Sequence, residues 1–281
     1  GFTVSANAQG GDSRVTVVID PGHGGVDVGS GNKTYNVYER EINLKIAQYF
    51  KEELETYDGV NVYMTRYDNT DTSLGTKGDG LRKRAQIAKD YGADLLVSVH
   101  CNSNETGTVR GAEVYYQNAS LFHHDFHVQG EKLANGILSH ISSLGIGNRG
   151  ARVMKSTDGE TYEDGYLADY YTILIAARRA GIMGLIVEHA YLNNNDEYNE
   201  FLSSDDKLRN LGIADATAVA EHYGLRKKHS SDSDLTDGTY IISAVTDGQS
   251  VMQANKTAVD LKAETGADSQ LFDVTALNDG T

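Results

Sequence analysis

Short apolar runs alternate along the chain with longer segments whose apolar residues recur about every three or four positions. The short runs are rich in Val, Ile and Leu, which is typical of buried strands, and the periodic segments predict amphipathic helices. The predicted strands are residues 15–20, 60–65, 94–99, 112–116 and 184–188. The first predicted helix begins near residue 41, and further helices are predicted at 81–91, 126–144 and 168–180. A last predicted helix has an apolar face of Ile213, Ala216, Ala220 and Tyr223.

This alternation indicates the fold class of residues 15–224. Short strands separated by amphipathic helices form βαβ crossovers, which build a mostly parallel, twisted sheet with helices on both faces. The predicted class is therefore α/β. Pro21 is the only proline in the chain, so Gly, Asn and Asp must end the helices instead.

Both ends of the chain differ from this pattern. Residues 225–238 are polar and predict a linker, and residues 239–281 predict a small β-rich segment with strands at 239–245 and 270–274. So short a segment holds little core alone, which favours a truncated module or a segment that docks on the main domain. Residues 1–14 predict a tail. Its Ala6 and Ala8 have the spacing of a signal-peptidase site, so the tail is interpreted as a signal-peptide remnant or as a chance match.

Charge and cysteine content narrow the functional classes. The formal net charge is −15, which argues against a nucleic-acid partner but permits a carbohydrate, a peptide or a cation. No apolar run is long enough to span a bilayer. The single cysteine, Cys101, excludes an intrachain disulfide and does not by itself indicate a compartment.

Three titratable residues follow predicted strands. His23 lies in a glycine-rich segment directly after the first strand, His100 follows the strand at 94–99, and Glu188 ends the strand at 184–188. The carboxyl ends of parallel strands meet at one edge of a sheet, where α/β proteins bind their ligands. Glu39, at the start of the first helix, can face the same edge.

Two imidazoles and one carboxylate around an open position form the donor set of catalytic zinc sites. Zinc lowers the pKa of a bound water and polarises a carbonyl. A fourth protein ligand would close the site, so Glu188 is predicted to be the general base and acid. Glu41 competes with Glu39 as the ligand, although a helix turns it to another face.

Other interpretations of these carboxylates remain open. Glu39 can stabilise a helix N-terminus through the helix dipole. Glu188 can form an ion pair with Arg66 or Arg84. A carboxylate after an apolar strand is costly to bury unless a cation or a metal neutralises it.

Neighbouring residues are predicted to have no role in the metal site. Side chains alternate along a strand, so Cys101 points away from His100 as a buried thiol, and His189 points away from Glu188. The group His123, His124 and His127 has neither a strand end nor a carboxylate beside it, so it is not expected to bind metal.

A series of ordered motifs points to a known family. They are residues 17–25, 39–44, 64–66, 81–88, 97–102, 111–116, 149–150 and 186–194. Over about residues 15–224 the chain resembles the zinc-dependent N-acetylmuramoyl-L-alanine amidases of the type-3 amidase family. Departures from the usual pattern at Met183, Ala190, Tyr191 and Cys101 do not involve a ligand.

The resemblance implies roles for individual residues. It assigns the zinc ligands to His23, Glu39 and His100, which favours Glu39 over Glu41, and the catalytic glutamate to Glu188. It implies a secreted or cell-wall hydrolase that cleaves the amide between N-acetylmuramic acid and L-alanine in peptidoglycan. The alternatives are a zinc peptidase that acts within the stem peptide and a catalytically inactive cell-wall binding protein.

Several further expectations accompany this assignment. The segment 155–170 is predicted to be a lid or a solvated loop. Residues 239–281 resemble one lobe of a ricin-type β-trefoil, which implies binding of cell-wall glycan. The candidates for substrate binding, each with a structural role as the alternative, are Arg66, Arg84, Asn102 and Arg149.

Overall fold

The computed structural model describes residues 14–75, 78–228, 239–244, 251–255 and 272–275. The chain divides into two compact units, Gly1–Lys228 and His229–Thr281, and the division lies inside the predicted linker. The signal-peptide interpretation concerns residues before Arg14, which lie outside the described residues. None of the helices described is long and apolar enough to cross a membrane.

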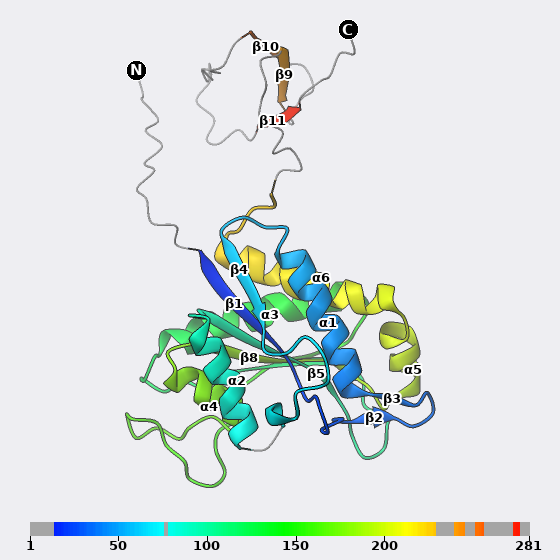
Figure 1. Cartoon of the computed structure of the whole chain (residues 1–281), viewed down its shortest axis with the longest axis vertical. Coiled ribbons are helices and arrows are strands. Elements are labelled where there is room, and N and C mark those ends of the chain that lie inside the picture. The colour runs from blue at the N-terminus through cyan, green and yellow to red at the C-terminus, as the bar shows by residue number, and fades with distance from the viewer. Residues whose placement is uncertain (1–13, 76–77, 229–238, 245–250, 256–271, 276–281) are drawn as a thin grey trace. The chain divides into compact units, whose positions relative to one another are not determined.

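A six-stranded sheet forms the centre of the first unit (Figure 1), with the order β4-β1-β5-β8-β6-β7. Its strands are β1 (Val15–Pro21), β4 (Val60–Met64), β5 (Leu95–Asn102), β6 (Ala112–Tyr116), β7 (Asn148–Arg152) and β8 (Met183–Tyr191). The strands β4, β1, β5 and β8 are parallel, whereas β6 runs antiparallel to β8 and pairs in parallel with β7. The prediction of a mostly parallel sheet is confirmed, and two reversed strands extend it at one edge.

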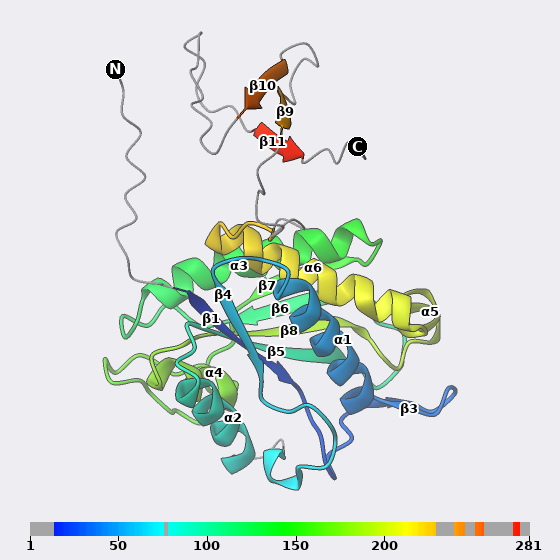
Figure 2. The ribbon, with the colours of Figure 1, turned by 45° about the horizontal axis from the view of Figure 1, so that its top comes forward.

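Helices cover both faces of this sheet, as Figures 1 and 2 show. One face carries α1 (Glu39–Leu54), α3 (Asp125–Ser143) and α6 (Asp205–Tyr223), and the other carries α2 (Asp79–Asp90) and α4 (Thr172–Arg179). Alternation along β1 separates the two cores. Val17 and Ile19 pack with the first helix group and Val18 packs with the second, all with no exposed surface.

The predicted helix at 168–180 is confirmed, but its predicted start is wrong, because α4 begins only at Thr172. The backbone before it bonds to another segment instead: Ser156 N–H donates to Ala168 O and Tyr170 N–H to Met154 O. The carboxylate of Asp169 also accepts the N–H of Asn118 at 2.8 Å. The segment 155–170 is thus an irregular loop that is bonded to the domain at its end.

Several short elements are not predicted by the sequence pattern. They are the hairpin of β2 (Gly31–Asn32) and β3 (Val37–Tyr38), the edge strand β7, the short helix η1 (Thr72–Leu74), α5 (Asn195–Glu197) and the π-turn η2 (Tyr198–Leu202). None of them has an apolar run or a periodic apolar stripe long enough to identify it.

The second unit contains a three-stranded antiparallel sheet of order β10-β9-β11. Its strands are β9 (Thr239–Ala244), β10 (Val251–Asn255) and β11 (Phe272–Thr275). The two predicted strands correspond to β9 and β11, and β10 was not predicted. The likeness to a trefoil lobe stays a prediction.

A buried ion pair fixes the end of β1, just before the turn that carries His23. Arg84 of α2 donates to Asp20 at 2.6 Å, and both side chains are 1% exposed. Asp20 also accepts the hydroxyls of Ser98, at 2.6 Å, and of Thr65. Burial raises the pKa of Asp20, but the Arg84 guanidinium and these hydrogen bonds lower it further, to below its ordinary value.

The turn itself is held by two arginines through its backbone oxygens. Arg84 donates to the carbonyls of Pro21, at 2.9 Å, and of His23, at 2.6 Å. Arg66 donates to the carbonyls of Pro21, at 2.8 Å, and of Gly22, at 2.9 Å. Arg84 is wholly buried and Arg66 is 4% exposed. Both arginines therefore support the turn, which is the structural role expected as the alternative, and their contact with substrate stays a prediction.

Loss of the Asp20 carboxylate should strongly destabilise the domain. Asp20→Ala leaves the Arg84 guanidinium buried without its partner, which costs about 3–5 kcal/mol. Glu52→Gln, which breaks an exposed pair with Arg209, should cost less than about 1 kcal/mol. Urea unfolding measures both changes, and equal losses in the two variants would contradict the role given to the buried pair.

The same carboxylate should make stability depend on acid pH. Because its pKa is lowered in the folded protein, Asp20 contributes stability above its unfolded pKa of about 3.8, and that contribution is lost as the pH falls through the folded value. The difference in unfolding free energy between the wild type and Asp20→Asn should therefore shrink below about pH 4. A constant difference from neutral to acid pH would argue against it.

Candidate metal centre

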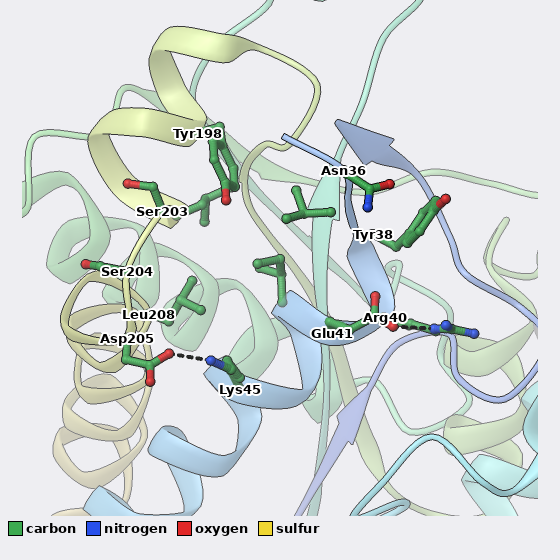
Figure 3. Close-up of a pocket in the computed structure, with 13 residues that line it drawn as sticks. Asn36, Tyr38, Arg40, Glu41, Lys45, Tyr198, Ser203, Ser204, Asp205 and Leu208 are labelled. Atoms are coloured by element: carbon green, nitrogen blue, oxygen red, sulfur yellow. Dashed lines mark hydrogen bonds and ion pairs between the residues drawn. The ribbon is translucent and has the colours of Figure 1, made fainter. Parts of the chain in front are cut away.

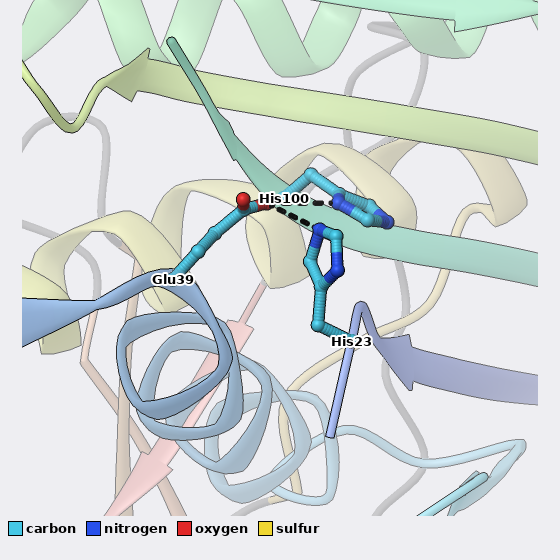
Figure 4. Close-up of side chains that lie close together, drawn as sticks. All are labelled: His23, Glu39 and His100. Carbon is cyan, nitrogen blue, oxygen red and sulfur yellow. Dashed lines mark hydrogen bonds and ion pairs between the residues drawn. The ribbon is translucent and has the colours of Figure 1, made fainter. Parts of the chain in front are cut away.

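Three predicted ligands from three elements meet at the carboxyl edge of the sheet (Figure 4). His23 comes from the turn after β1, His100 from the end of β5 and Glu39 from the first residue of α1. The Oε1 atom of Glu39 lies 3.2 Å from His23 Nε2 and 3.0 Å from His100 Nδ1. Within the described part of the chain, no other group of three His, Cys, Asp or Glu side chains converges in this way.

These separations fit a metal ion. In a tetrahedral zinc site, bonds of about 2.0–2.1 Å place neighbouring ligand atoms about 3.3 Å apart. Two of the three ligand distances are close to that value, and the three ligand atoms all lie within 4.8 Å of one another. Two neutral nitrogen donors and one carboxylate are also the donor types that zinc accepts at catalytic sites.

The backbone of the turn and one carboxylate orient His23. The residue has φ of 60°, a left-handed conformation that histidine adopts more readily than most residues. Its Nδ1 lies 2.9 Å from Asp27 Oδ2, which leaves Nε2 directed at Glu39. A carboxylate on the second ring nitrogen fixes the tautomer and the ring orientation of a metal-binding histidine.

Glu39 is held by four groups besides the two imidazoles. It is 4% exposed, and it accepts the N–H of Ser30 at 2.9 Å, the N–H of Cys101 at 3.2 Å and the side-chain amide of Asn43 at 3.2 Å. The helix N-terminus provides the fourth favourable interaction. Burial raises the pKa of Glu39, but hydrogen bonds with His100 and His23 lower it further, to well below its usual range.

The structure also separates Glu39 from its competitor. Glu41 pairs with the Nε of Arg40 at 2.6 Å and takes no part in the cluster. A helical step of two residues turns the side chain away, as the sequence predicted.

His100 packs tightly against the turn that carries His23. A Cβ atom on Gly22 would lie 2.2 Å from Nε2 of His100, so only glycine fits beneath the ring. Nδ1 of His189 donates to the carbonyl of His100, 3.0 Å away, and Nε2 lies 2.8 Å from Oδ2 of the buried Asp215. His189 therefore points away from the cluster, as predicted, and stabilises the strand behind it.

The structure also places three other residues that the sequence singled out, Cys101, His127 and Asn102. Cys101 is 2% exposed, and burial raises the pKa of its thiol, which confirms a buried, protonated cysteine. His127 contacts the carbonyl of Gln117 at 3.0 Å and does not join a metal cluster. The side chain of Asn102 accepts the N–H of Ser103 at 2.8 Å, so its contact with substrate stays a prediction.

Glu188 lies beside His100 in the sheet, since the two are register partners on β8 and β5. Its Oε2 is buried, and no donor among the described residues reaches that atom. The predicted alternative, an ion pair with Arg66 or Arg84, is wrong because both arginines bind the turn. Burial and the negative charges of Glu39 and Glu113 raise the pKa of Glu188 well above its usual value, which makes it a stronger proton acceptor.

On the other side of Glu188, a second buried carboxylate collects four donors. Glu113 of β6 is 4% exposed and is the register partner of Glu188. It accepts the hydroxyls of Tyr115 and Tyr191, each at 2.9 Å, and binds the Nε atoms of Arg149, at 2.6 Å, and of Arg152, at 3.0 Å. Of this group, only Arg149 is a candidate from the sequence, because the strand that carries both arginines is too polar to predict.

A separate groove runs along the outside of α1 (Figure 3). Its volume is about 440 Å³, and it lies between the β3–α1 junction and the start of α6. Tyr38, Arg40 and Glu41 line it, and an ion pair between Lys45 and Asp205 connects its two walls. These residues are neighbours of Glu39 in the sequence, but no ligand of the cluster lines the groove.

The chain is similar to a family and to proteins that are named amidases. A family model described as N-acetylmuramoyl-L-alanine amidase matches residues 17–221. "Probable N-acetylmuramoyl-L-alanine amidase AmiB" of Haemophilus influenzae is 32% identical over 101 residues, which are 36% of this chain and 22% of that protein. "Probable cell wall amidase LytH" of Staphylococcus aureus is 32% identical over 139 residues, which are 49% of this chain and 40% of that protein.

Solved structures agree with this likeness. An N-acetylmuramoyl-L-alanine amidase from Clostridium difficile 630 has 27% sequence identity and a TM-score of 0.58, with 75% of this chain and 98% of that chain covered. The match spans less than half the length of both curated relatives.

Substitution of Gly22 should weaken metal binding without unfolding the domain. In Gly22→Ala, the new Cβ displaces the His100 ring, and a misplaced ligand should lower zinc affinity roughly 10- to 100-fold. Gly75→Ala is the matched control, because its Cβ would meet nothing within 4 Å. Zinc titration with a competing chelator measures both variants, and unchanged affinity in Gly22→Ala would refute the packing argument.

Proposed function

Because the chain belongs to the N-acetylmuramoyl-L-alanine amidase family, we propose that it hydrolyses the amide between N-acetylmuramic acid and L-alanine of peptidoglycan with one zinc ion. The observation that carries the proposal is the juxtaposition of a three-ligand cluster with a buried carboxylate that has no donor. The three-ligand cluster can hold a metal, and the buried carboxylate of Glu188 can accept a proton. Metal-assisted amide hydrolysis requires both of these functions.

The residues of this chain divide the work. His23, Glu39 and His100 would hold the ion and leave its remaining position open to solvent and substrate. A bound zinc ion supplies a water of lowered pKa and an electrophile for the scissile carbonyl. Glu188 accepts the proton of the attacking water at Oε2 and then donates it to the departing amine of L-alanine.

The setting of action follows from the substrate. Peptidoglycan lies outside the cytoplasmic membrane, so we propose that the protein acts at the cell wall after secretion. The predicted binding of cell-wall glycan by residues 239–281 would keep the enzyme on its substrate.

Digestion of purified peptidoglycan distinguishes the proposed reaction from its alternatives. The zinc-loaded protein should release stem peptides with a free L-alanine amino group and leave the glycan strands intact, as mass spectrometry of the products would show. Cleavage inside the peptide would indicate a zinc peptidase. An absence of products, with zinc and peptidoglycan both bound, would indicate an inactive binding protein.

Glu188→Gln should separate metal binding from turnover. The amide cannot accept a proton, so kcat should fall roughly 10²–10⁴-fold, while zinc content stays at one ion per chain. Glu221→Gln, which alters an exposed carboxylate paired with His140, should keep full activity. Activity near the wild-type level in Glu188→Gln would mean that another residue moves the proton.

Removal of the metal should abolish turnover reversibly. Dialysis against a chelator should leave the circular dichroism spectrum unchanged, since the buried core does not include the ligand cluster. Activity should return on addition of about one equivalent of zinc. Full activity in metal-free protein would disprove the zinc-dependent mechanism.

A further inference from the structure

Two arginines share one buried carboxylate beside Glu188. Arg149 and Arg152 come from β7, and each binds Glu113 through its Nε atom. Burial raises the pKa of Glu113, but hydrogen bonds from Arg149, Tyr115 and Tyr191 lower it further, so Glu113 is ionised. Two positive charges and one negative charge leave this cluster with a net positive charge.

The two guanidinium groups are available to a ligand. The side chains of Arg149 and Arg152 are 36% and 44% exposed, although the carboxylate they bind is buried. Each guanidinium has further N–H groups beyond the Nε that binds Glu113. Among the described residues, neither arginine forms an ion pair with a second acidic side chain.

Glu113 and its neighbours hold both arginines in place. Arg152 also donates to the carbonyl of Arg149 at 3.0 Å, and the Arg149 guanidinium lies 5.5 Å from the ring centre of Tyr191. A cation fixed in this way loses little conformational freedom when it binds an anion, which favours affinity. A fixed guanidinium is matched in geometry to a carboxylate, which it can bind through two parallel hydrogen bonds.

The register of the sheet places this cluster near the reacting bond. His100, Glu188 and Glu113 occupy one row across β5, β8 and β6, and β7 is the next strand. Neighbouring strands lie about 4.8 Å apart, so the arginines are about two strands, or roughly 10 Å, from Glu188. An extended peptide covers about 3.3–3.6 Å per residue, so the cluster is two to three residues from the bond that Glu188 serves.

A peptide group of matching charge occurs at that distance. In the stem peptide, the residue after L-alanine is a D-glutamate that is linked through its side chain, and its α-carboxyl group is either free or amidated. The free form carries a negative charge within two residues of the scissile amide. The amidated form has the same shape and no charge, so it provides a matched comparison.

We propose that Arg149 and Arg152 form a carboxylate-binding pair that selects stem peptides whose second residue has a free α-carboxyl group. This inference rests on the proposed amidase function and adds a substrate preference to it. Arg149 and Arg152 bind the carboxylate, and Glu113 is the positioning residue that keeps them in place.

The test uses two soluble muropeptides and two sacculus preparations that differ only in amidation of that carboxyl group. The kcat/KM of the zinc-loaded wild type should be roughly 10- to 100-fold higher for the free-acid form than for the amidated form. The amidated form loses a charged hydrogen bond, and this factor is the expected cost of that loss. In Arg149→Gln and Arg152→Gln, the rate on the free acid should fall towards the rate on the amide, which should change little. Arg149→Lys should keep part of the preference, because lysine retains the positive charge but cannot form two parallel hydrogen bonds with a carboxylate.

The controls separate this pair from a merely structural role. Arg209→Gln removes an exposed arginine that also pairs with a carboxylate, and it should keep the wild-type preference. A variant that is only destabilised loses rate on both substrates equally, which thermal unfolding would reveal. A wild type without preference, or a preference unchanged in both Gln variants, would overturn the inference. If no substrate yields a stem peptide with a free L-alanine amino group, that result would instead refute the amidase function and the inference with it.

Discussion

The buried ion pair between Asp20 and Arg84 is the interaction on which the site depends. It is costly to form, because two charges leave water, and it is favourable here only because further hydrogen bonds satisfy both groups. The same arginine also binds the carbonyl of His23, so the pair connects α2, the end of β1 and the turn in one unit. A histidine on a glycine-rich turn has little rigidity of its own, and this unit fixes the position of His23, the proposed metal ligand.

Two carboxylates at strand ends illustrate how the surroundings determine chemistry. Asp20 in β1 and Glu188 in β8 both follow a run of apolar residues, and both are removed from water. Asp20 faces the guanidinium of Arg84, which lowers its pKa and keeps it charged at neutral pH. Burial and the negative charges of Glu39 and Glu113 raise the pKa of Glu188, and no donor among the described residues reaches its Oε2. Arg66 and Arg84 both bind the turn that carries His23, so neither of them neutralises Glu188. The contacts that make the turn rigid therefore also leave Glu188 basic.

The sequence predicted the parts of the structure that follow from periodicity. Apolar strands and amphipathic helices identified the parallel sheet, and a parallel sheet places His23, His100 and Glu188 at one edge without any knowledge of their contacts. The carboxylate hub at Glu113 could not be predicted in this way. It depends on β6 running antiparallel and on β7, a strand of Asn, Arg, Gly and Ala whose existence depends on pairing with a neighbour rather than on its own residues.

The antiparallel direction of β6 affects how the proposed site can distinguish between substrates. In a sheet of parallel strands alone, the next strand beside Glu188 would contribute a loop at this edge, and loops are mobile and variable. An antiparallel strand instead places a regular backbone, with Glu113 directly opposite Glu188, beside the reacting groups. The side chains proposed to hold the metal lie on one side of β8, and Arg149 and Arg152 lie on the other. A substrate that crosses β8 would therefore contact two sites, the metal cluster with Glu188 and the pair of Arg149 and Arg152. The strand spacing sets the distance between these sites. The scissile bond and the negative charge of the peptide must be separated by that same distance.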